Sequence, residues 1–234
     1  MYHTCRALVL QFVAHTDKTT LVRLYTREQG KVWAAVSGLH GRKSGAKSAL
    51  FSPLAPLQVT LQDKGGHLRI QEAGVIAAYN SIATHPGKRS MAFFLAELLV
   101  HSLPDHDADE ALFDFLYNKV QILEQTSFNP DFHLHLMMHL TQYLGIYPNL
   151  DVEGAFFDLE GGVCRMLRPN HPHYLSPEDT ELFCRLCMVE DSADLDLTRQ
   201  KRQALLGHLL EYYRLHIPYF GQLRSVSVLQ ELFD

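Results

Sequence analysis

The sequence contains little cysteine and no long apolar run. Its 234 residues include only four cysteines, which are too few and too widely spaced for the disulfide framework of a small secreted domain. No apolar stretch approaches the roughly 20 residues that a membrane-spanning helix requires. The first residues also do not have the layout of a signal peptide. We therefore expect a protein of the reducing cytoplasm.

Nucleotide-binding and hydrolase motifs are also missing. The sequence has no P-loop, no G-x-S-x-G and no G-x-G-x-x-G, so it does not encode the phosphate cradles or nucleophile turns of those patterns. His135 and His139 have a spacing that can chelate a metal ion, but Leu136 stands where the HExxH motif has glutamate. We expect no enzyme, no cofactor and no metal ion. A metal-dependent hydrolase stays open as an alternative that bound metal would reveal.

The pair Cys184 and Cys187 has the spacing of half a zinc site. Cys164, His171 and His173 could supply further ligands. Against a zinc site, the pair falls within an expected helix, where both side chains share a face with apolar neighbours. Two cysteines on one helix face are more often small buried hydrophobes. The sequence therefore favours buried thiols and leaves a residual metal site near Cys164, Cys184 and Cys187 open.

The net charge of −5 conceals an asymmetry along the chain. Residues 1–80 carry ten basic and four acidic side chains, a net charge of +6, whereas the remaining residues carry eleven and twenty-two, a net charge of −11. Such a division indicates that the first third binds a polyanion and that the rest has another task.

Residues 1–79 have the pattern of a small barrel. Five segments rich in β-branched and aromatic residues follow one another without a long helix, at 5–13, 19–26, 31–38, 53–62 and 67–76. We expect a five-stranded OB-fold barrel that binds nucleic acid, although SH3-like barrels have similar strand counts.

Residues 80–234 change to the apolar periodicity of helices. Residues 80–87 are expected to be a linker, and residues 146–175 an irregular hairpin insertion. Asp107 is the expected N-cap of one helix, with Glu110 completing a capping box. The chain is thus predicted to be a two-domain α+β protein, with an OB-fold domain followed by an all-α helical domain.

The stretch from Thr19 to Lys47 organises the barrel. Gly30 suits the left-handed position that ends a three-residue loop, and Glu28 would begin that loop. The register that follows pairs Arg27 with Lys31, Tyr25 with Trp33 and Arg23 with Ala35. Because successive side chains alternate between faces, one face would be apolar and the other would carry Arg23, Tyr25, Arg27, Lys31 and Trp33.

A glycine-punctuated basic loop continues this cationic and aromatic face. Backbone phosphates attract cations, and unpaired bases stack on flat rings. The expected nucleic-acid-binding residues are Arg23, Tyr25, Arg27, Lys31, Trp33, Arg42, Lys43 and Lys47. An ordinary amphipathic hairpin with solvated charges explains the same pattern and stays open.

Four segments together resemble one known family. They are TTLVRLYTREQGKVWAAVSGLHGRKS at 19–44, FLAELLVHSL at 94–103, LGIYPNL at 144–150 and LRSVSVLQEL at 223–232. In order and spacing they are similar to features of the RecO family of bacterial DNA repair proteins. The resemblance implies an OB-fold followed by a helical domain, and a nucleoid-associated, non-catalytic recombination mediator.

The resemblance also implies the partners. They would be single- and double-stranded DNA, RecR and sometimes RecF, the C-terminal tail of single-strand-binding protein, and RecA indirectly. The implied activities are annealing of complementary strands and help in loading RecA onto strands coated with single-strand-binding protein.

The chain departs from the family in its hairpin segment. Many members carry a four-cysteine zinc hairpin, whereas only Cys164 matches here, and Leu167 stands where its partner would be. The chain therefore resembles a zinc-free variant, with the hairpin held by packing of Phe156, Phe157 and Tyr174. The alternative function is a protein-interaction adaptor whose barrel binds RNA or no nucleic acid.

Overall fold

The computed structural model describes residues 1–16, 19–38, 48–77, 79–151, 153–190, 195 and 197–231. Within it the chain divides into two compact units. The first combines Met1–Phe128 with Leu223–Leu232, and the second is built mainly from Asn129–Gln222. Each unit is described by itself below.

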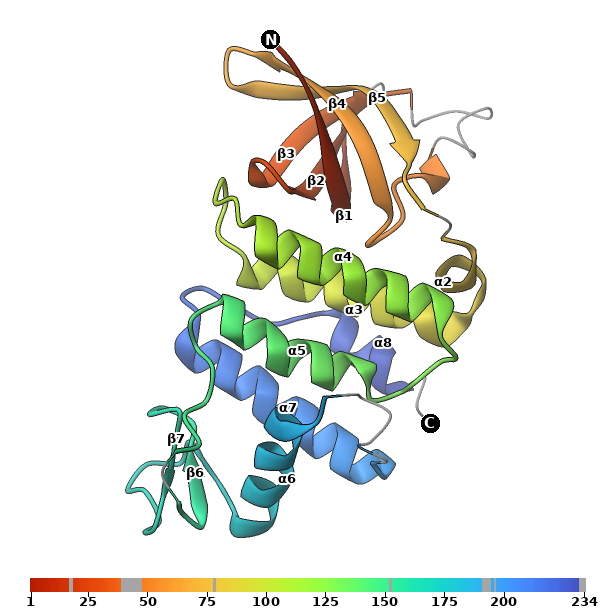
Figure 1. The fold of residues 1–234 in the computed structure, drawn as a ribbon. Coiled ribbons are helices and arrows are strands. Elements are labelled where there is room, and N and C mark those ends of the chain that lie inside the picture. The colour runs from red at the N-terminus through yellow and green to blue at the C-terminus, as the bar shows by residue number, and fades with distance from the viewer. Residues whose placement is uncertain are drawn as a thin grey trace. The chain divides into compact units, whose positions relative to one another are not determined.

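A closed five-stranded barrel forms the N-terminal part of the first unit, at the top of Figure 1. Its strands are β1 (Tyr2–Thr16), β2 (Thr19–Thr26), β3 (Gly30–Ser37), β4 (Pro56–Lys64) and β5 (His67–Val75). They close in the order β1-β2-β3-β5-β4, with antiparallel neighbours except for the parallel pair β3 and β5. The predicted OB-fold is therefore confirmed.

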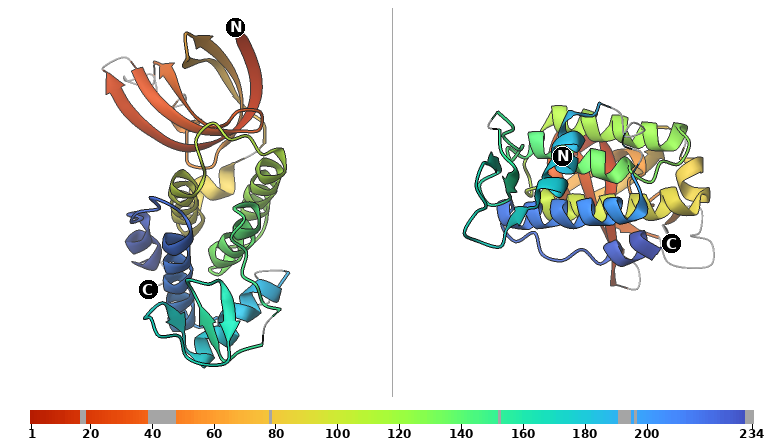
Figure 2. Two further views of the ribbon diagram at one scale, coloured as in Figure 1. Left: turned by 90° about the vertical axis from the view of Figure 1, so that its left-hand side faces the viewer. Right: turned by 90° about the horizontal axis from the view of Figure 1, so that it is seen from below.

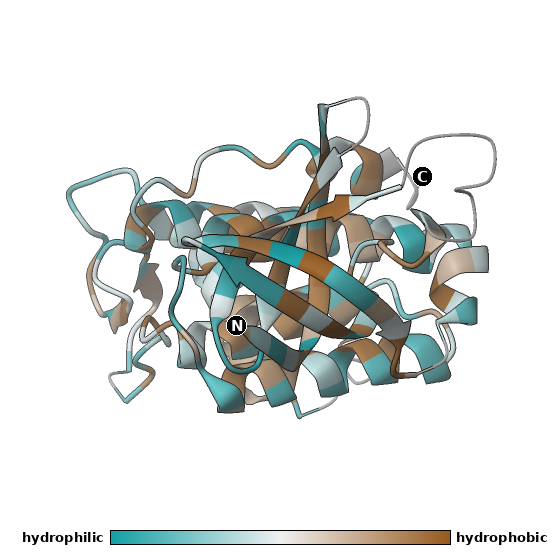
Figure 3. Cartoon of the chain, turned by 90° about the horizontal axis from the view of Figure 1, so that it is seen from above, coloured by the Kyte–Doolittle hydropathy of each residue, from teal (hydrophilic) through white to brown (hydrophobic). Residues whose placement is uncertain are grey.

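Hydrophobic and hydrophilic residues alternate along the barrel strands, as the coloured bands show (Figure 3), and the barrel encloses an apolar core because successive side chains point to opposite faces. Val22, Leu24 and Val32 of the β2–β3 hairpin point inward and are almost fully buried. Leu57 and Val59 of β4 meet them from the other side of the core. The predicted apolar face of the hairpin is thus confirmed.

The register of the β2–β3 hairpin differs from the prediction: the loop lies one residue earlier in the chain, so each β2 residue pairs with a β3 residue two positions earlier than expected. Thr26 pairs with Gly30, so the turn contains Arg27, Glu28 and Gln29. The hydroxyl of Thr26 accepts a hydrogen bond from the Gln29 amide at 3.0 Å and donates one to the Gly30 carbonyl at 3.1 Å. Gly30 does have a positive φ of 66°, but it opens β3 instead of ending the loop. The expected pairs are wrong because this hydroxyl closes the turn one residue earlier.

In the described part of the first unit, the barrel is joined by α2 (Asn80–Thr84), α3 (Pro86–Ser102), α4 (Glu110–Gln125) and α8 (Ser225–Glu231). Both views of the ribbon place α3 and α4 against the same side of the barrel (Figures 1 and 2). The expected linker at 80–87 is therefore partly helical. The N-cap of α4 is Asp109, which accepts from the Leu112 amide at 2.9 Å, so the prediction of Asp107 was wrong.

Two carboxylates fix the short helices of this unit. Glu124 accepts hydrogen bonds from three amides at the start of α2, at 2.7 to 2.9 Å. Glu97 of α3 accepts from the amides of Arg224 and Ser225 at 3.0 and 2.8 Å, where α8 begins. Free amides at a helix start need such acceptors, so these glutamates hold α2 and α8 in place.

The second unit contains α5 (Phe132–Tyr143), α6 (Pro177–Met188) and α7 (Arg199–His216). The expected irregular insertion contains a small sheet of β6 (Phe156–Asp158), β7 (Val163–Arg165) and β8 (Tyr174–Leu175), in the order β7-β6-β8. The rings of Phe156 and Tyr174 meet edge to face at 5.9 Å. Phe157 is fully buried, 4.7 Å from the Phe183 ring. The aromatic packing expected for this hairpin is thus present.

No helix among the residues described is both long and apolar enough to cross a membrane.

Candidate nucleic-acid interface

The outer face of the β2–β3 hairpin gathers the side chains that the alternation predicts. Arg23 pairs with Trp33, and Tyr25 pairs with Lys31, so these four side chains lie on one face. Arg27 lies in the turn and not on a strand.

The connection from α3 to α4 and the first turns of α4 cover part of this face. Lys31 is only 5% exposed, and its amine donates to the carbonyl of Val100 at 2.7 Å and to that of Leu103. Its amine also lies 3.3 Å from the Asp105 carboxylate. Burial lowers the pKa of Lys31, helped by the charge of Arg23 and opposed by Asp105.

Tyr25 is also buried, with 1% of its surface exposed. Its hydroxyl donates to the Asp109 carbonyl at 3.4 Å, and burial raises its pKa. The expectation of one accessible cationic and aromatic face is therefore wrong for Tyr25 and Lys31. Their side chains dock the connection between α3 and α4 onto the barrel.

Arg27 and Arg23 are partly exposed and are already paired with carboxylates. The Arg27 guanidinium lies 2.7 Å from Glu110 and 3.1 Å from Asp114. The guanidinium of Arg23 lies 2.9 Å from Asp105 and 5.0 Å from the centre of the Trp33 ring. The segment from Asp105 to Asp114 thus neutralises both arginines.

Trp33 is the large aromatic side chain of this face that stays accessible. Its surface is 38% exposed, while Arg23 stacks on the indole as a cation–π partner. Arg42, Lys43 and Lys47, the other three predicted residues, lie outside the described part of the chain.

Arg69 extends this surface and was missed by the sequence argument. The parallel pairing of β3 and β5 sets Ala35 beside Arg69, and the exposed Arg69 side chain donates to the Ser37 hydroxyl at 3.1 Å. The signal was the alternation of Leu68, Arg69 and Ile70, which turns Arg69 outward. The sequence pattern does not predict which strands pair when the barrel closes, and this pairing places β5 beside β3. We call Arg23, Trp33 and Arg69 the exposed platform.

Two family models match the chain. One is described as "Recombination protein O N terminal" and matches residues 1–79; the other is "Recombination protein O C terminal" and matches residues 86–224. The chain belongs to the RecO family. Membership in this family gives it a role in DNA repair.

Curated RecO proteins align with the whole length of the chain. "DNA repair protein RecO" of Phocaeicola vulgatus is 33% identical over 97% of both chains. The protein of the same name from Porphyromonas gingivalis is 32% identical over 98% of both, and that from Azobacteroides pseudotrichonymphae is 28% identical over 100% of both.

The RecO family models and the packing of the chain divide it differently. The models meet near residues 79–86, as in the predicted domains 1–79 and 80–234. The compact units instead place α2, α3, α4 and α8 with the barrel. The domain assignment from the sequence stays a prediction.

The cysteines of this RecO chain do not gather into a metal centre in the part that the structure describes, where no three His, Cys, Asp or Glu side chains are arranged to hold an ion. The sulfurs of Cys164 and Cys184 lie 3.9 Å apart. Burial, with the neighbouring Cys164, raises the pKa of Cys184 to about 12. Since metals bind thiolates, this environment disfavours a ligand there. His135 is likewise buried, with Nε2 3.0 Å from the Val189 carbonyl.

Proposed function

We propose that this RecO chain is a non-catalytic recombination mediator that binds single- and double-stranded DNA. In this proposal it anneals complementary strands and, with RecR and sometimes RecF, helps to load RecA onto strands coated with single-strand-binding protein. A contact with the tail of that coating protein belongs to the same proposal. The function requires no cofactor, because it lowers a kinetic barrier by holding strands.

The observation that carries this proposal is the exposed platform on the barrel. The Trp33 indole offers a base a stacking surface, which is worth about 1–3 kcal/mol per base. Arg23 stacks on this indole, Arg69 lies beside Ala35 of the same strand, and Arg42, Lys43 and Lys47 follow β3 along the sequence. Arg27 stays a candidate of lower weight because its charge is already shared by two carboxylates. Tyr25 and Lys31 leave the proposed contact set, because they are buried.

The decisive experiment reverses the charges of the loop. Arg42→Glu with Lys43→Glu should weaken binding of a fluorescent single-stranded oligonucleotide and flatten the salt dependence of log Kd, because fewer phosphates are neutralised. The control is Arg89→Glu with Arg214→Glu, which changes the net charge equally at exposed helix positions. Unchanged anisotropy titrations for the loop variant would refute its place in the interface.

A second candidate function is an adaptor whose barrel binds no nucleic acid. The pairing of Arg23, Arg27 and Lys31 with carboxylates of the same unit favours it, because those cations are already neutralised. In that case the wild-type chain would not bind DNA even at low salt. A strand-annealing assay with and without single-strand-binding protein separates the two functions.

A further inference from the structure

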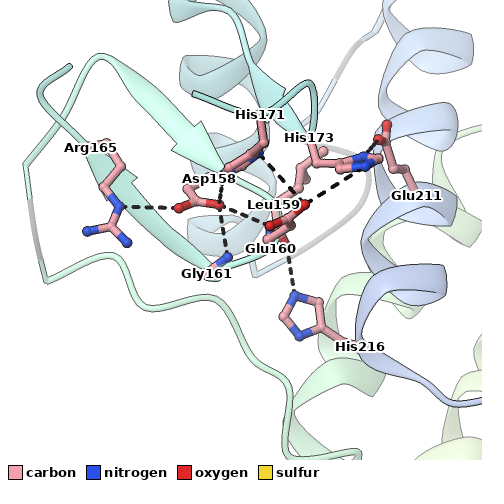
Figure 4. Close-up of polar contacts among 9 residues, drawn as sticks. All are labelled: Asp158, Leu159, Glu160, Gly161, Arg165, His171, His173, Glu211 and His216. Atoms are coloured by element: carbon pink, nitrogen blue, oxygen red, sulfur yellow. Dashed lines mark hydrogen bonds and ion pairs between the residues drawn. The ribbon is translucent and has the colours of Figure 1, made fainter. Parts of the chain in front are cut away.

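A cluster of histidines and carboxylates joins the small sheet of the second unit to α7 (Figure 4). It lies in the segment where the resemblance to RecO led us to expect only aromatic packing. Its members are Asp158, Glu160, Arg165, His171, His173, Glu211 and His216. None of these residues belongs to the proposed DNA contacts.

Asp158 is the fixed centre of the cluster. Its nearly buried carboxylate accepts from the amides of Glu160 and Gly161 at 3.0 and 2.9 Å, which shapes the turn after β6. Arg165 and His171 each approach it to 3.3 Å. Burial acts to raise the pKa of Asp158, but these hydrogen bonds and charges outweigh burial and hold the pKa below its ordinary value.

Two contacts fasten the turn and the following loop to α7. His173 Nδ1 lies 2.7 Å from the Glu211 carboxylate, and His216 Nε2 lies 2.8 Å from the Leu159 carbonyl. Leu159 in turn donates its amide to the His173 carbonyl at 3.0 Å. The backbone of the turn and the side chains of α7 therefore form one connected set of hydrogen bonds.

The second nitrogen of each loop histidine faces a third carboxylate. Glu160 Oε1 lies 3.9 Å from His171 Nδ1 and 3.8 Å from His173 Nε2. A neutral imidazole has one N–H, and the first carboxylate of each ring uses it. The nitrogen that faces Glu160 is then a lone pair opposite a negative charge. Consistently, His171 Nδ1 is enclosed and has no hydrogen-bond partner.

We propose that His173, Glu160 and Glu211 form a proton-operated latch, which holds the β6–β8 sheet more tightly on α7 as the pH falls. Proton uptake turns the lone pair of the His173 imidazole into an N–H donor for Glu160. The ring then bridges two carboxylates instead of one. Because Glu160 is half-exposed, its side chain can close the remaining distance.

The titratable and charged groups around the latch come from the small sheet, its turn and loop, and α7. On α6, which also packs on the sheet, Asp179 lies 3.5 Å from His208 of α7. Asp158 lies on β6, Arg165 on β7, Glu160 in the turn, and Glu211 and His216 on α7. Arg168 of the loop stacks on Tyr174, 4.9 Å from the ring centre. Arg165 therefore contacts Asp158, and Arg168 contacts an aromatic ring. Glu160 faces the two histidines instead.

The pKa of His173 supports the direction of the effect. The hydrogen bond to Glu211, and then the charges of Glu211 and Glu160, raise the pKa of His173 above 6.5 despite some burial. A group whose pKa is raised by folding stabilises the fold fully below its unfolded pKa, and loses that contribution as the pH rises through its folded pKa. The latch should therefore be closed below about pH 6.5 and weaken above it.

The test is an NMR titration of the histidine rings in the full chain. His173, assigned by comparison with His173→Asn, should titrate above pH 6.5. Glu211→Gln and Glu160→Gln should each lower its pKa, the former by more because its contact is shorter. Glu181→Gln, on the exposed face of α6, is the matched control and should change nothing.

A second readout separates a latch from a merely structural contact. In wild type, hydrogen exchange at the Leu159 amide, corrected for the intrinsic pH dependence, should be more protected at pH 5.5 than at pH 7.5. Glu160→Gln should reduce this difference while leaving the fold intact, since Glu160 is half-exposed and the Glu211 contact stays. The proposal is overturned if the pKa of His173 does not move in Glu160→Gln, or if the protection is the same at both pH values.

Discussion

The β2–β3 hairpin and the β6–β8 sheet both direct cationic side chains at carboxylates, and they do so with different chemistry. On the hairpin the cations are Arg23, Arg27 and Lys31, and arginine and lysine side chains ordinarily carry their charge at neutral pH. On the sheet they are His171 and His173, which gain their charge only by binding a proton.

Because of this difference, contacts between cations and carboxylates hold one region permanently and the other in a pH-dependent way. Lys31 is buried and bound by carbonyls as well as by Asp105, so its contact is a permanent dock within the first unit. The histidine contacts are half-exposed and depend on pH. Four predictions probe the permanent dock and the surface that it leaves open, starting with the largest expected effect.

Removing the buried cation should have the largest effect. Lys31→Ala leaves the carbonyls of Val100 and Leu103 without this donor and removes one of the two cations that contact Asp105. We expect the free energy of unfolding to fall by about 2–4 kcal/mol, because an orphaned buried group keeps its desolvation cost. Urea unfolding followed by the fluorescence of Trp33, the single tryptophan, measures this. Lys64→Ala, at an exposed position of the same barrel, should change stability little; equal losses would refute the dock.

The next effect should come from the tight approach at Gly30. Gly30→Ala would place a methyl group against the backbone of Asp107 at a positive φ of 66°. Gly65 has a nearly identical φ of 65° with open space around its Cα, so Gly65→Ala reports the backbone strain alone. We expect Gly30→Ala to cost about 1–3 kcal/mol more than Gly65→Ala. Thermal unfolding of both variants checks this, and equal costs would contradict the close contact.

The third prediction concerns the surface that the dock leaves open. Trp33→Ala should raise the Kd for single-stranded DNA about 5- to 100-fold, because a base loses its stacking partner. Tyr219→Ala removes another aromatic side chain, one that is fully exposed in the second unit, and should leave the Kd unchanged. Anisotropy titrations at one salt concentration measure the Kd of both variants and of wild type. Similar affinities for Trp33→Ala and wild type would remove the indole from the interface.

The smallest effect should follow from releasing Arg23. Asp105 is half-exposed, so Asp105→Asn should change stability by less than about 1 kcal/mol. The freed guanidinium beside Trp33 should lower the Kd for DNA about two- to fivefold, because one more cation can meet a phosphate. Glu178→Gln, an exposed charge change on α6, serves as the control. Weaker DNA binding by Asp105→Asn would show that Asp105 positions Arg23 for the ligand instead of competing with it.

Much of the fold could be predicted from the sequence, since alternation and helical periodicity are local properties. Val22, Leu24 and Val32 were correctly placed inside the barrel, and Gly30 was correctly given a positive φ. The register failed because it depended on one hydroxyl, that of Thr26, which bridges the turn.

The candidate site could be predicted only in part. Alternation placed Arg23, Tyr25, Lys31 and Trp33 on one face, as observed. The accessibility of these four side chains depends on carboxylates and carbonyls that lie about 70 to 80 residues further along the chain. No local sequence pattern predicts these long-range contacts. The same limit hid Arg69, whose position follows from barrel closure.

The carboxylate of Glu97 at the start of α8 has a consequence for the order of events during synthesis. Residues 1–128 leave the ribosome long before Ser225 does, yet Ser225 and the helix after it belong to the same compact unit. The contact between Glu97 and the start of α8 can therefore form only after residue 225 has been synthesised, long after the barrel and α3.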